Sequence, residues 1–133
     1  MKRILLAIVA IIFSMSVSTQ SQDKTAHEVP CSNHGTQAEA NACARLDYQK
    51  ANVEMIKSYD QLMTELVDYG GKAPQMLQRA QASWTQYREM NCESEASIYE
   101  GGSIRPAVYY SCMASVTRER SRRLAEFLAV TRQ

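Results

Sequence analysis

The sequence predicts an all-α fold, a small antiparallel three-helix bundle stapled by two disulfides. Three stretches carry apolar residues at alternating spacings of three and four, the period of one helix face, and no long stretch alternates with the period of two typical of a strand. Each break between these stretches is a glycine pair followed by a proline: Gly70-Gly71 with Pro74, and Gly101-Gly102 with Pro106. Helices joined by such short turns pack antiparallel.

Residues 1–21 have the features of a cleavable bacterial secretory signal. A basic start is followed by an uninterrupted apolar run over residues 4–13, too short to span the roughly 30 Å core of a bilayer, and then by small and hydroxyl residues. We expect cleavage between Ser18 and Gln22. The first cysteine, Cys31, lies well beyond that point, so no lipid-anchored cysteine would follow the cut. The mature chain is expected to be periplasmic or secreted, without a membrane anchor.

A flexible arm is expected over residues 22–35, because this segment is polar, contains a proline and a glycine, and lacks periodicity. The first helix should follow it directly. Thr36 and Glu39 have the spacing of a capping box, in which the Thr36 hydroxyl accepts from the Glu39 backbone and the Glu39 side chain reaches back. The helical domain is therefore expected to occupy residues 36–133.

The three helices each have a predicted apolar face. The first should end at Gly70-Gly71, because glycine readily adopts the left-handed conformation that ends helices. Its face comprises Ala44, Tyr48, Ala51, Met55, Tyr59, Leu62, Leu66 and Tyr69, widened by Ile56, Met63 and Val67. The second, from Pro74 to about Tyr99, carries Leu77, Ala80, Trp84, Tyr87 and Asn91. The third begins near Pro106 and carries Tyr109, Cys112 or Met113, Val116, Arg120, Leu124 and Phe127.

The charge balance argues against a nucleic-acid partner. Loss of the signal removes two basic residues, so the 15 basic and 14 acidic residues of the chain become 13 and 14, a net charge of −1, whereas nucleic-acid binders carry a basic surplus. The one basic cluster comprises Arg118, Arg120, Arg122 and Arg123, with Glu119 and Glu126 nearby. We interpret it as a solvated helix face.

Four cysteines in an exported chain of this size predict two disulfides. Cys92 and Cys112 lie roughly 10 Å and 9 Å from the second turn at 1.5 Å per residue, so they are level across that hairpin. Cys43 lies at a similar height, which leaves a Cys43–Cys92 pair open. We favour Cys31 with Cys43 and Cys92 with Cys112, because a crossed pattern would require the arm carrying Cys31 to reach another helix.

Enzymatic and metal-binding functions have little support in the sequence. Cys31, His34 and Cys43 resemble a partial zinc site, but no second Cys-x-x-C pair completes it, and exported cysteines form disulfides. The only histidines, His27 and His34, lie in the polar arm and offer no partner for a cysteine nucleophile. We therefore predict no catalytic residues, no cofactor and no metal.

Residues 80–92 contain the only tryptophan of the chain, Trp84. A tryptophan at helical spacing with apolar neighbours is ordinarily a core residue. We expect Trp84 and Tyr87 to pack into the seam of the bundle, Arg88 to lie beside that seam with its stem on apolar surface, and Cys92 to staple the helix to its neighbour. This segment is therefore interpreted as structural rather than catalytic.

Beyond the helix periodicity, the chain shows a set of residues at fixed spacings. These are Leu77, Ala80-Gln81, Trp84, Tyr87-Arg88, Cys92, Gly101-Gly102-Ser103, Cys112, Thr117, Arg120 and Leu124, together with residues 40–55. In this pattern the chain, from Cys31 onward, resembles the N-terminal domain of the family named for the lysozyme inhibitor LprI. The resemblance implies an exported, disulfide-stapled helical domain and, for some members, inhibition of lysozyme. One departure is that Asn52 stands where the family usually has an aspartate.

Two classes of function follow from this resemblance. The first is a binding protein that blocks a peptidoglycan-cleaving enzyme, either a host lysozyme or the effector of a rival bacterium. The second is a non-inhibitory envelope binding or stress module. For the first class, the hypothetical inhibitory element is the loop at residues 101–106, where Arg105 and Ser103 would meet the catalytic carboxyl groups and Tyr99 and Tyr109 would supply aromatic contacts. The alternative for this loop is a plain turn between two helices.

Overall fold

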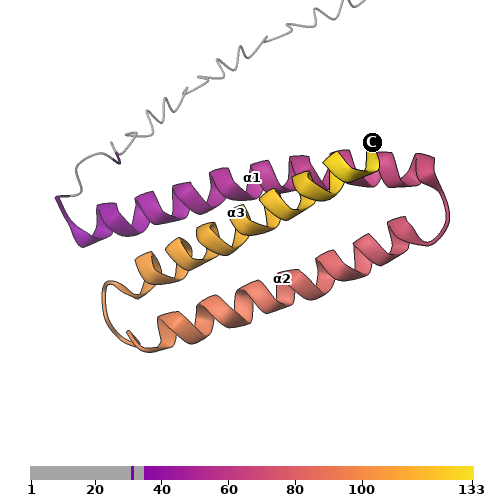
Figure 1. Cartoon of the computed structure of the whole chain (residues 1–133). Coiled ribbons are helices and arrows are strands. Elements are labelled where there is room, and N and C mark those ends of the chain that lie inside the picture. The colour runs from indigo at the N-terminus through magenta and orange to yellow at the C-terminus, as the bar shows by residue number, and fades with distance from the viewer. Residues whose placement is uncertain (1–30, 32–34) are drawn as a thin grey trace, which may run out of the picture.

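The structure, a computed structural model, describes Cys31 and residues 35–133. The described part of the chain forms three α-helices, α1 (Gln37–Tyr69), α2 (Ala73–Ser97) and α3 (Arg105–Thr131), and contains no strand. Consecutive helices run antiparallel, so α3 is parallel to α1 and packs along it, with α2 beside the pair (Figure 1). The predicted all-α three-helix fold is confirmed. The expected signal and nearly all of the expected arm lie outside the described residues.

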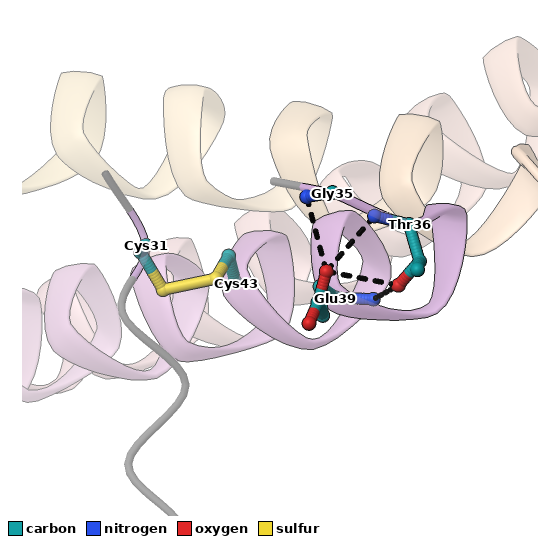
Figure 2. Close-up of a disulfide and its surroundings, with 5 residues drawn as sticks. All are labelled: Cys31, Gly35, Thr36, Glu39 and Cys43. Atoms are coloured by element: carbon teal, nitrogen blue, oxygen red, sulfur yellow. Dashed lines mark hydrogen bonds between the residues drawn. A yellow bond between two sulfur atoms is a disulfide. The ribbon is translucent and has the colours of Figure 1, made fainter. Parts of the chain in front are cut away.

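The start of α1 is fixed by the predicted capping box. The Glu39 backbone N–H donates to Thr36 Oγ1 at 3.2 Å, and Glu39 Oε2 accepts from the Thr36 backbone N–H at 2.9 Å. Glu39 Oε2 also accepts from the Gly35 backbone N–H at 3.0 Å (Figure 2). These bonds satisfy backbone donors that have no partner within the helix, so α1 begins where the sequence predicts.

The two turns use the glycines that the sequence singles out. Gly70 and Gly71 have φ of 79° and 72°, and Gly101 has φ of 74°, backbone angles that residues with a Cβ rarely adopt. A proline stands in the first turn of both α2 and α3, where its missing N–H costs no helical hydrogen bond.

The three described helices were also compared with the requirements of a membrane span. None of them combines the length and the hydrophobicity that a transmembrane helix needs.

Both disulfides lie at the same end of the bundle. Cys31 pairs with Cys43 and Cys92 pairs with Cys112, with Cα–Cα distances of 5.6 Å and 5.5 Å. The predicted pairing is confirmed, and it accounts for all four cysteines of the chain. The first bridge ties the segment before α1 to that helix (Figure 2), and the second closes the hairpin of α2 and α3. The opposite end, at Gly70, has no covalent link.

The core has two parts. One cluster lies toward the Gly70 turn and comprises Met55, Leu62, Leu66, Leu77, Leu124 and Leu128, with Trp84 packed against it. The other surrounds the second disulfide and comprises Cys92, Cys112 and Met113, with Tyr48 and Tyr109 packed against it. Between the two clusters, a polar layer crosses the bundle at the level of Arg88 and Thr117, both buried.

The predicted register of α2 is wrong by one position after Trp84. Tyr87, expected in the seam, has 59% of its surface exposed, whereas Arg88 is only 5% exposed. Ala80 is exposed as well. The buried stripe continues from Trp84 through Arg88, Cys92 and Ala96 in steps of four. Because Cys92 is held against α3 by its disulfide, the residue four positions earlier, Arg88, must face the bundle.

Several large apolar residues that were assigned to the core lie on the surface instead. Ile56, Val67, Tyr69 and Phe127 are exposed, while Thr117 and Leu128, which were not predicted, are buried. The predicted apolar stripes were too wide, because each helix packs against only two others and an arc of its surface stays in water.

Candidate functional site

The predicted inhibitory loop lies at the stapled end of the bundle. Helix α2 ends at Ser97, α3 begins at Arg105, and the segment between them is exposed to solvent. The Cys92–Cys112 bridge joins the two helices behind it. The turn is therefore displayed at one tip of the molecule, beside the start of α1 (Figure 1).

The backbone of this loop is held by hydrogen bonds on several sides. Asn41 of α1 donates its Nδ2 to the carbonyl oxygen of Ser103 at 2.9 Å, a contact between segments 62 positions apart. Within the loop, the Gly102 N–H donates to the Tyr99 carbonyl at 2.9 Å and the Arg105 N–H donates to the Gly102 carbonyl at 3.2 Å. Together with the disulfide, these bonds give the loop a defined shape before any partner arrives.

Arg105 is paired with carboxylates of its own chain. Its Nε donates to Glu100 Oε2 at 2.9 Å, and its Nη2 donates to Glu93 Oε1. About 28% of the Arg105 side chain remains exposed. Such surface ion pairs contribute roughly 0 to 1 kcal/mol, so a carboxylate of a partner can replace either one at small cost.

The two predicted tyrosines occupy different environments. Tyr99 is exposed in the loop, next to Ile98, which has 80% of its surface exposed. Tyr109 is partly buried, packs against the second disulfide, and meets Tyr110 edge to face with ring centroids 5.3 Å apart. Burial raises the pKa of Tyr109, and the nearby carboxylates of Glu89 and Glu93 raise it further. Tyr109 therefore packs in the cluster around the second disulfide, behind the loop, while Tyr99 is exposed on the loop itself.

Tyr99 and Ser103 lie in the exposed segment between α2 and α3, and Arg105, partly exposed, is the first residue of α3. The sequence interpretation missed Ile98 and Ile104, which are exposed apolar residues at the two ends of the same loop. Both residues could have been noticed in the sequence, because a large apolar side chain close to the glycine pair of a turn does not pack in the core. The carboxylate partners Glu93 and Glu100 were also missed, since only the folded turn places them beside Arg105.

The polar layer inside the bundle is a second cluster of interest. The Arg88 guanidinium donates to Thr117 Oγ1 at 3.2 Å and to Asn52 Oδ1 at 3.4 Å. It lies 4.8 Å from the ring centroid of Trp84 and 5.4 Å from that of Tyr48. Asn52, the position at which the sequence departs from the family pattern, is therefore a direct partner of a buried arginine. These contacts cross all three helices and indicate a structural role.

The four arginines of the basic cluster on α3 lie in two different environments. Arg118 pairs with Asp47, and Arg122 and Arg123 pair with Glu119 and Glu126, so the solvated-face interpretation is confirmed for these three arginines. It is wrong for Arg120, which is partly buried and lies 5.8 Å from the Trp84 ring centroid. Burial lowers the pKa of Arg120.

Among the described residues, no group of three histidine, cysteine or acidic side chains could hold a metal ion. Cys31 and Cys43, the basis of the zinc alternative, are joined in a disulfide and offer no thiolate. His27 and His34 lie outside the described residues.

Comparison with known proteins gives three matches. A family model described as lysozyme inhibitor LprI matches residues 30–124. A protein of Rhizobium meliloti (strain 1021), described as uncharacterized, is 33% identical over 112 residues, covering 76% of this chain and 80% of that protein. A crystal structure of a DUF1311 family protein from Pseudomonas putida KT2440 superposes with a TM-score of 0.64 at 26% identity, covering 71% of this chain and 95% of that one.

Proposed function

The chain belongs to the lysozyme inhibitor LprI family, and on this premise we propose that it is an exported inhibitor of a lysozyme-type peptidoglycan hydrolase, acting by binding. The target is a host lysozyme or the peptidoglycan-cleaving effector of a rival bacterium. Two disulfides in a small helical domain fit the oxidising environment in which such an inhibitor works. Family membership also fits a protein without catalytic activity of its own.

The inhibitory element in this proposal is the loop at residues 101–106, and the observation that carries it is the fixed shape of that loop. A disulfide behind it, a hydrogen bond from Asn41 and its internal bonds have already ordered the chain. A preordered loop loses little conformational entropy on binding, so more of the contact energy is expressed as affinity. Exposed Tyr99 and Ile98 supply the apolar and aromatic surface that commonly anchors interfaces.

The charge of Arg105 suits a glycosidase cleft. A retaining lysozyme has two carboxyl groups about 5 Å apart, one protonated as the general acid and one ionised. A single guanidinium balances that single negative charge and can donate hydrogen bonds to both groups. To do so, Arg105 exchanges Glu93 or Glu100 for a carboxyl group of the enzyme, while Ser103 adds a hydroxyl donor.

The alternative is a non-inhibitory envelope binding or stress module. The observation that favours it is the pairing of Arg105 with Glu93 and Glu100, which leaves the loop electrostatically satisfied as a plain turn. The two functions differ in a measurable way. An inhibitor suppresses peptidoglycan cleavage by a purified enzyme, whereas a module of the second kind leaves that activity unchanged.

Replacing both Ser103 and Arg105 by alanine is expected to weaken lysozyme inhibition by roughly tenfold to a hundredfold, because hydrogen bonds to charged groups contribute about 1.5 to 3 kcal/mol. Lytic rates of a c-type and a g-type lysozyme are measured against inhibitor concentration. The matched control is Arg132→Ala, which removes an arginine paired with Glu65 at the other end of the bundle and should inhibit like the wild type.

The melting temperature of the double variant must first match that of the wild type. Undiminished inhibition by the folded variant would place the inhibitory surface elsewhere on the molecule. If Arg132→Ala weakened inhibition equally, the effect would come from the loss of a positive charge anywhere on the protein rather than from the loop.

A further inference from the structure

A groove between α2 and α3 lies far from the loop, near the Gly70 turn. We call it the α2–α3 groove; it has a volume of about 400 Å³ and is lined chiefly by Met76, Leu77, Ala80, Arg120, Leu124 and Phe127. The lining is apolar except at two arginines, Arg120 and Arg123. Met76 has 59% of its surface exposed and Phe127 has 45%, so neither side chain completes the core. The groove thus offers an apolar surface that the bundle itself does not cover.

Arg120 lines this groove and has no ion-pair partner among the described residues. Its Nε donates to Gln81 Oε1 at 3.0 Å, whereas its Nη2 is buried and has no hydrogen-bond partner among the described residues. In that same part of the chain, Arg120 forms no ion pair, although Arg118, Arg122 and Arg123 each pair with a carboxylate. The Arg120 side chain as a whole is only partly buried and lines the groove, so an anion in the groove can approach its charge.

We propose that the α2–α3 groove binds an anionic amphiphile, a carboxylate with a medium-length alkyl chain. The carboxylate pairs with the partly exposed Arg120 guanidinium, and the alkyl chain lies against Met76, Leu77 and Phe127. From Arg120 to Phe127 the groove follows seven residues of α3, about 10 Å at 1.5 Å per residue. Arg123, the other arginine of the groove, is already paired with Glu119 and Glu126. Arg120 therefore leaves one cation without a carboxylate partner beside an apolar surface, which matches a molecule with a single negatively charged end. This binding site is separate from the loop and does not depend on lysozyme inhibition.

The test is calorimetric titration of the full mature protein with decanoate below its micelle concentration. We expect saturable binding at one site per chain, at least about tenfold weaker for Arg120→Met, because the charged hydrogen bond is lost. Arg123→Met is the matched control, since Arg123 also borders the groove but is paired with Glu119 and Glu126, and it should bind like the wild type. Met76→Glu, at an exposed position that the fold tolerates, should abolish binding by placing a carboxylate in the groove.

Trp84 provides a second readout, because it is the only tryptophan of the chain and its ring lies 5.8 Å from the Arg120 guanidinium. Decanoate should shift its fluorescence with the same midpoint as the calorimetric titration. Decanol and decyltrimethylammonium, which share the chain but lack the anion, should bind at least about tenfold more weakly.

Three results would overturn the proposal. The first is no saturable heat with decanoate. The second is that the wild type binds decanol as tightly as decanoate, or that Arg120→Met binds decanoate as tightly as the wild type does. Either result would show that the arginine plays no part in binding. The third is sedimentation of the wild type as a dimer that Met76→Glu dissociates, because the groove would then be covered by a second copy.

Discussion

Replacement of Trp84 by alanine is expected to lower the free energy of unfolding by about 3 kcal/mol, the lower end of the range for large aromatic residues because Trp84 is only partly buried. The indole packs against the leucine cluster near the Gly70 turn and lies within 6 Å of two guanidinium groups, those of Arg88 and Arg120. Its removal leaves a cavity and takes away two cation–π contacts at once. For a small domain, this is a large fraction of total stability.

Chemical denaturation followed by circular dichroism measures this loss. Tyr87→Ala is the matched control, because Tyr87 is an aromatic residue on the same helix but is exposed, and it should change the free energy of unfolding by less than about 0.5 kcal/mol. An unchanged melting temperature for Trp84→Ala, together with loss of partner binding, would make the tryptophan a surface contact and refute its place in the core.

Removal of the Cys92–Cys112 bridge by the paired change to alanine is expected to destabilise the protein by about 3 kcal/mol. The bridge links residues 20 positions apart, and its loss restores conformational freedom to the unfolded hairpin. It also removes buried sulfur atoms, since Cys92 is fully buried and belongs to the core cluster at that end. Denaturant midpoints of the oxidised wild type and the variant give the difference.

The Cys31–Cys43 bridge provides an internal comparison. It spans 12 positions, and Cys31 is exposed, so its removal should cost less, by about 0.5 kcal/mol from the shorter loop alone. A larger loss from this pair than from Cys92 and Cys112 would contradict the assignment of the second bridge to the core. The same variants test the loop, because inhibition should weaken far more when the bridge behind it is removed.

Local sequence signals predicted most of the fold. The capping box at Thr36, the glycine pairs and the two prolines fix the helix ends through backbone geometry alone, so they can be recognised without tertiary information. For the disulfides, the heights of the cysteines left a Cys43–Cys92 pair open, and the pairing was favoured because of the limited reach of the segment before α1. These features depend on a few residues close in sequence.

The register of α2 could not be predicted in the same way. Apolar residues occur on two adjacent faces of this helix, and the charged Arg88 was assigned to the edge of the seam because arginine is rarely buried. The structure buries it by combining Thr117, Asn52 and two aromatic rings from three helices. A residue whose burial depends on partners 29 and 36 positions away gives no local signal.

The candidate loop likewise has some features that the sequence shows and one that only the folded structure shows. Its glycine pair, its cationic residue and its position between two bridged cysteines were all evident in the sequence. The pairing of Arg105 with Glu93 and Glu100 was not, because it depends on how the turn folds back against the last turn of α2. That pairing is the reason that lysozyme binding has to be measured rather than inferred from charge alone.

The most direct test of the proposed function is the lytic activity of a lysozyme titrated with the purified, oxidised mature chain. Residual cleavage of peptidoglycan is measured against the molar ratio of inhibitor to enzyme, for c-type and g-type lysozymes. The proposal predicts that cleavage by at least one of them falls toward zero as a one-to-one complex forms. Full activity of every peptidoglycan hydrolase tested, at saturating concentrations of the folded protein, would contradict it and favour the non-inhibitory envelope module.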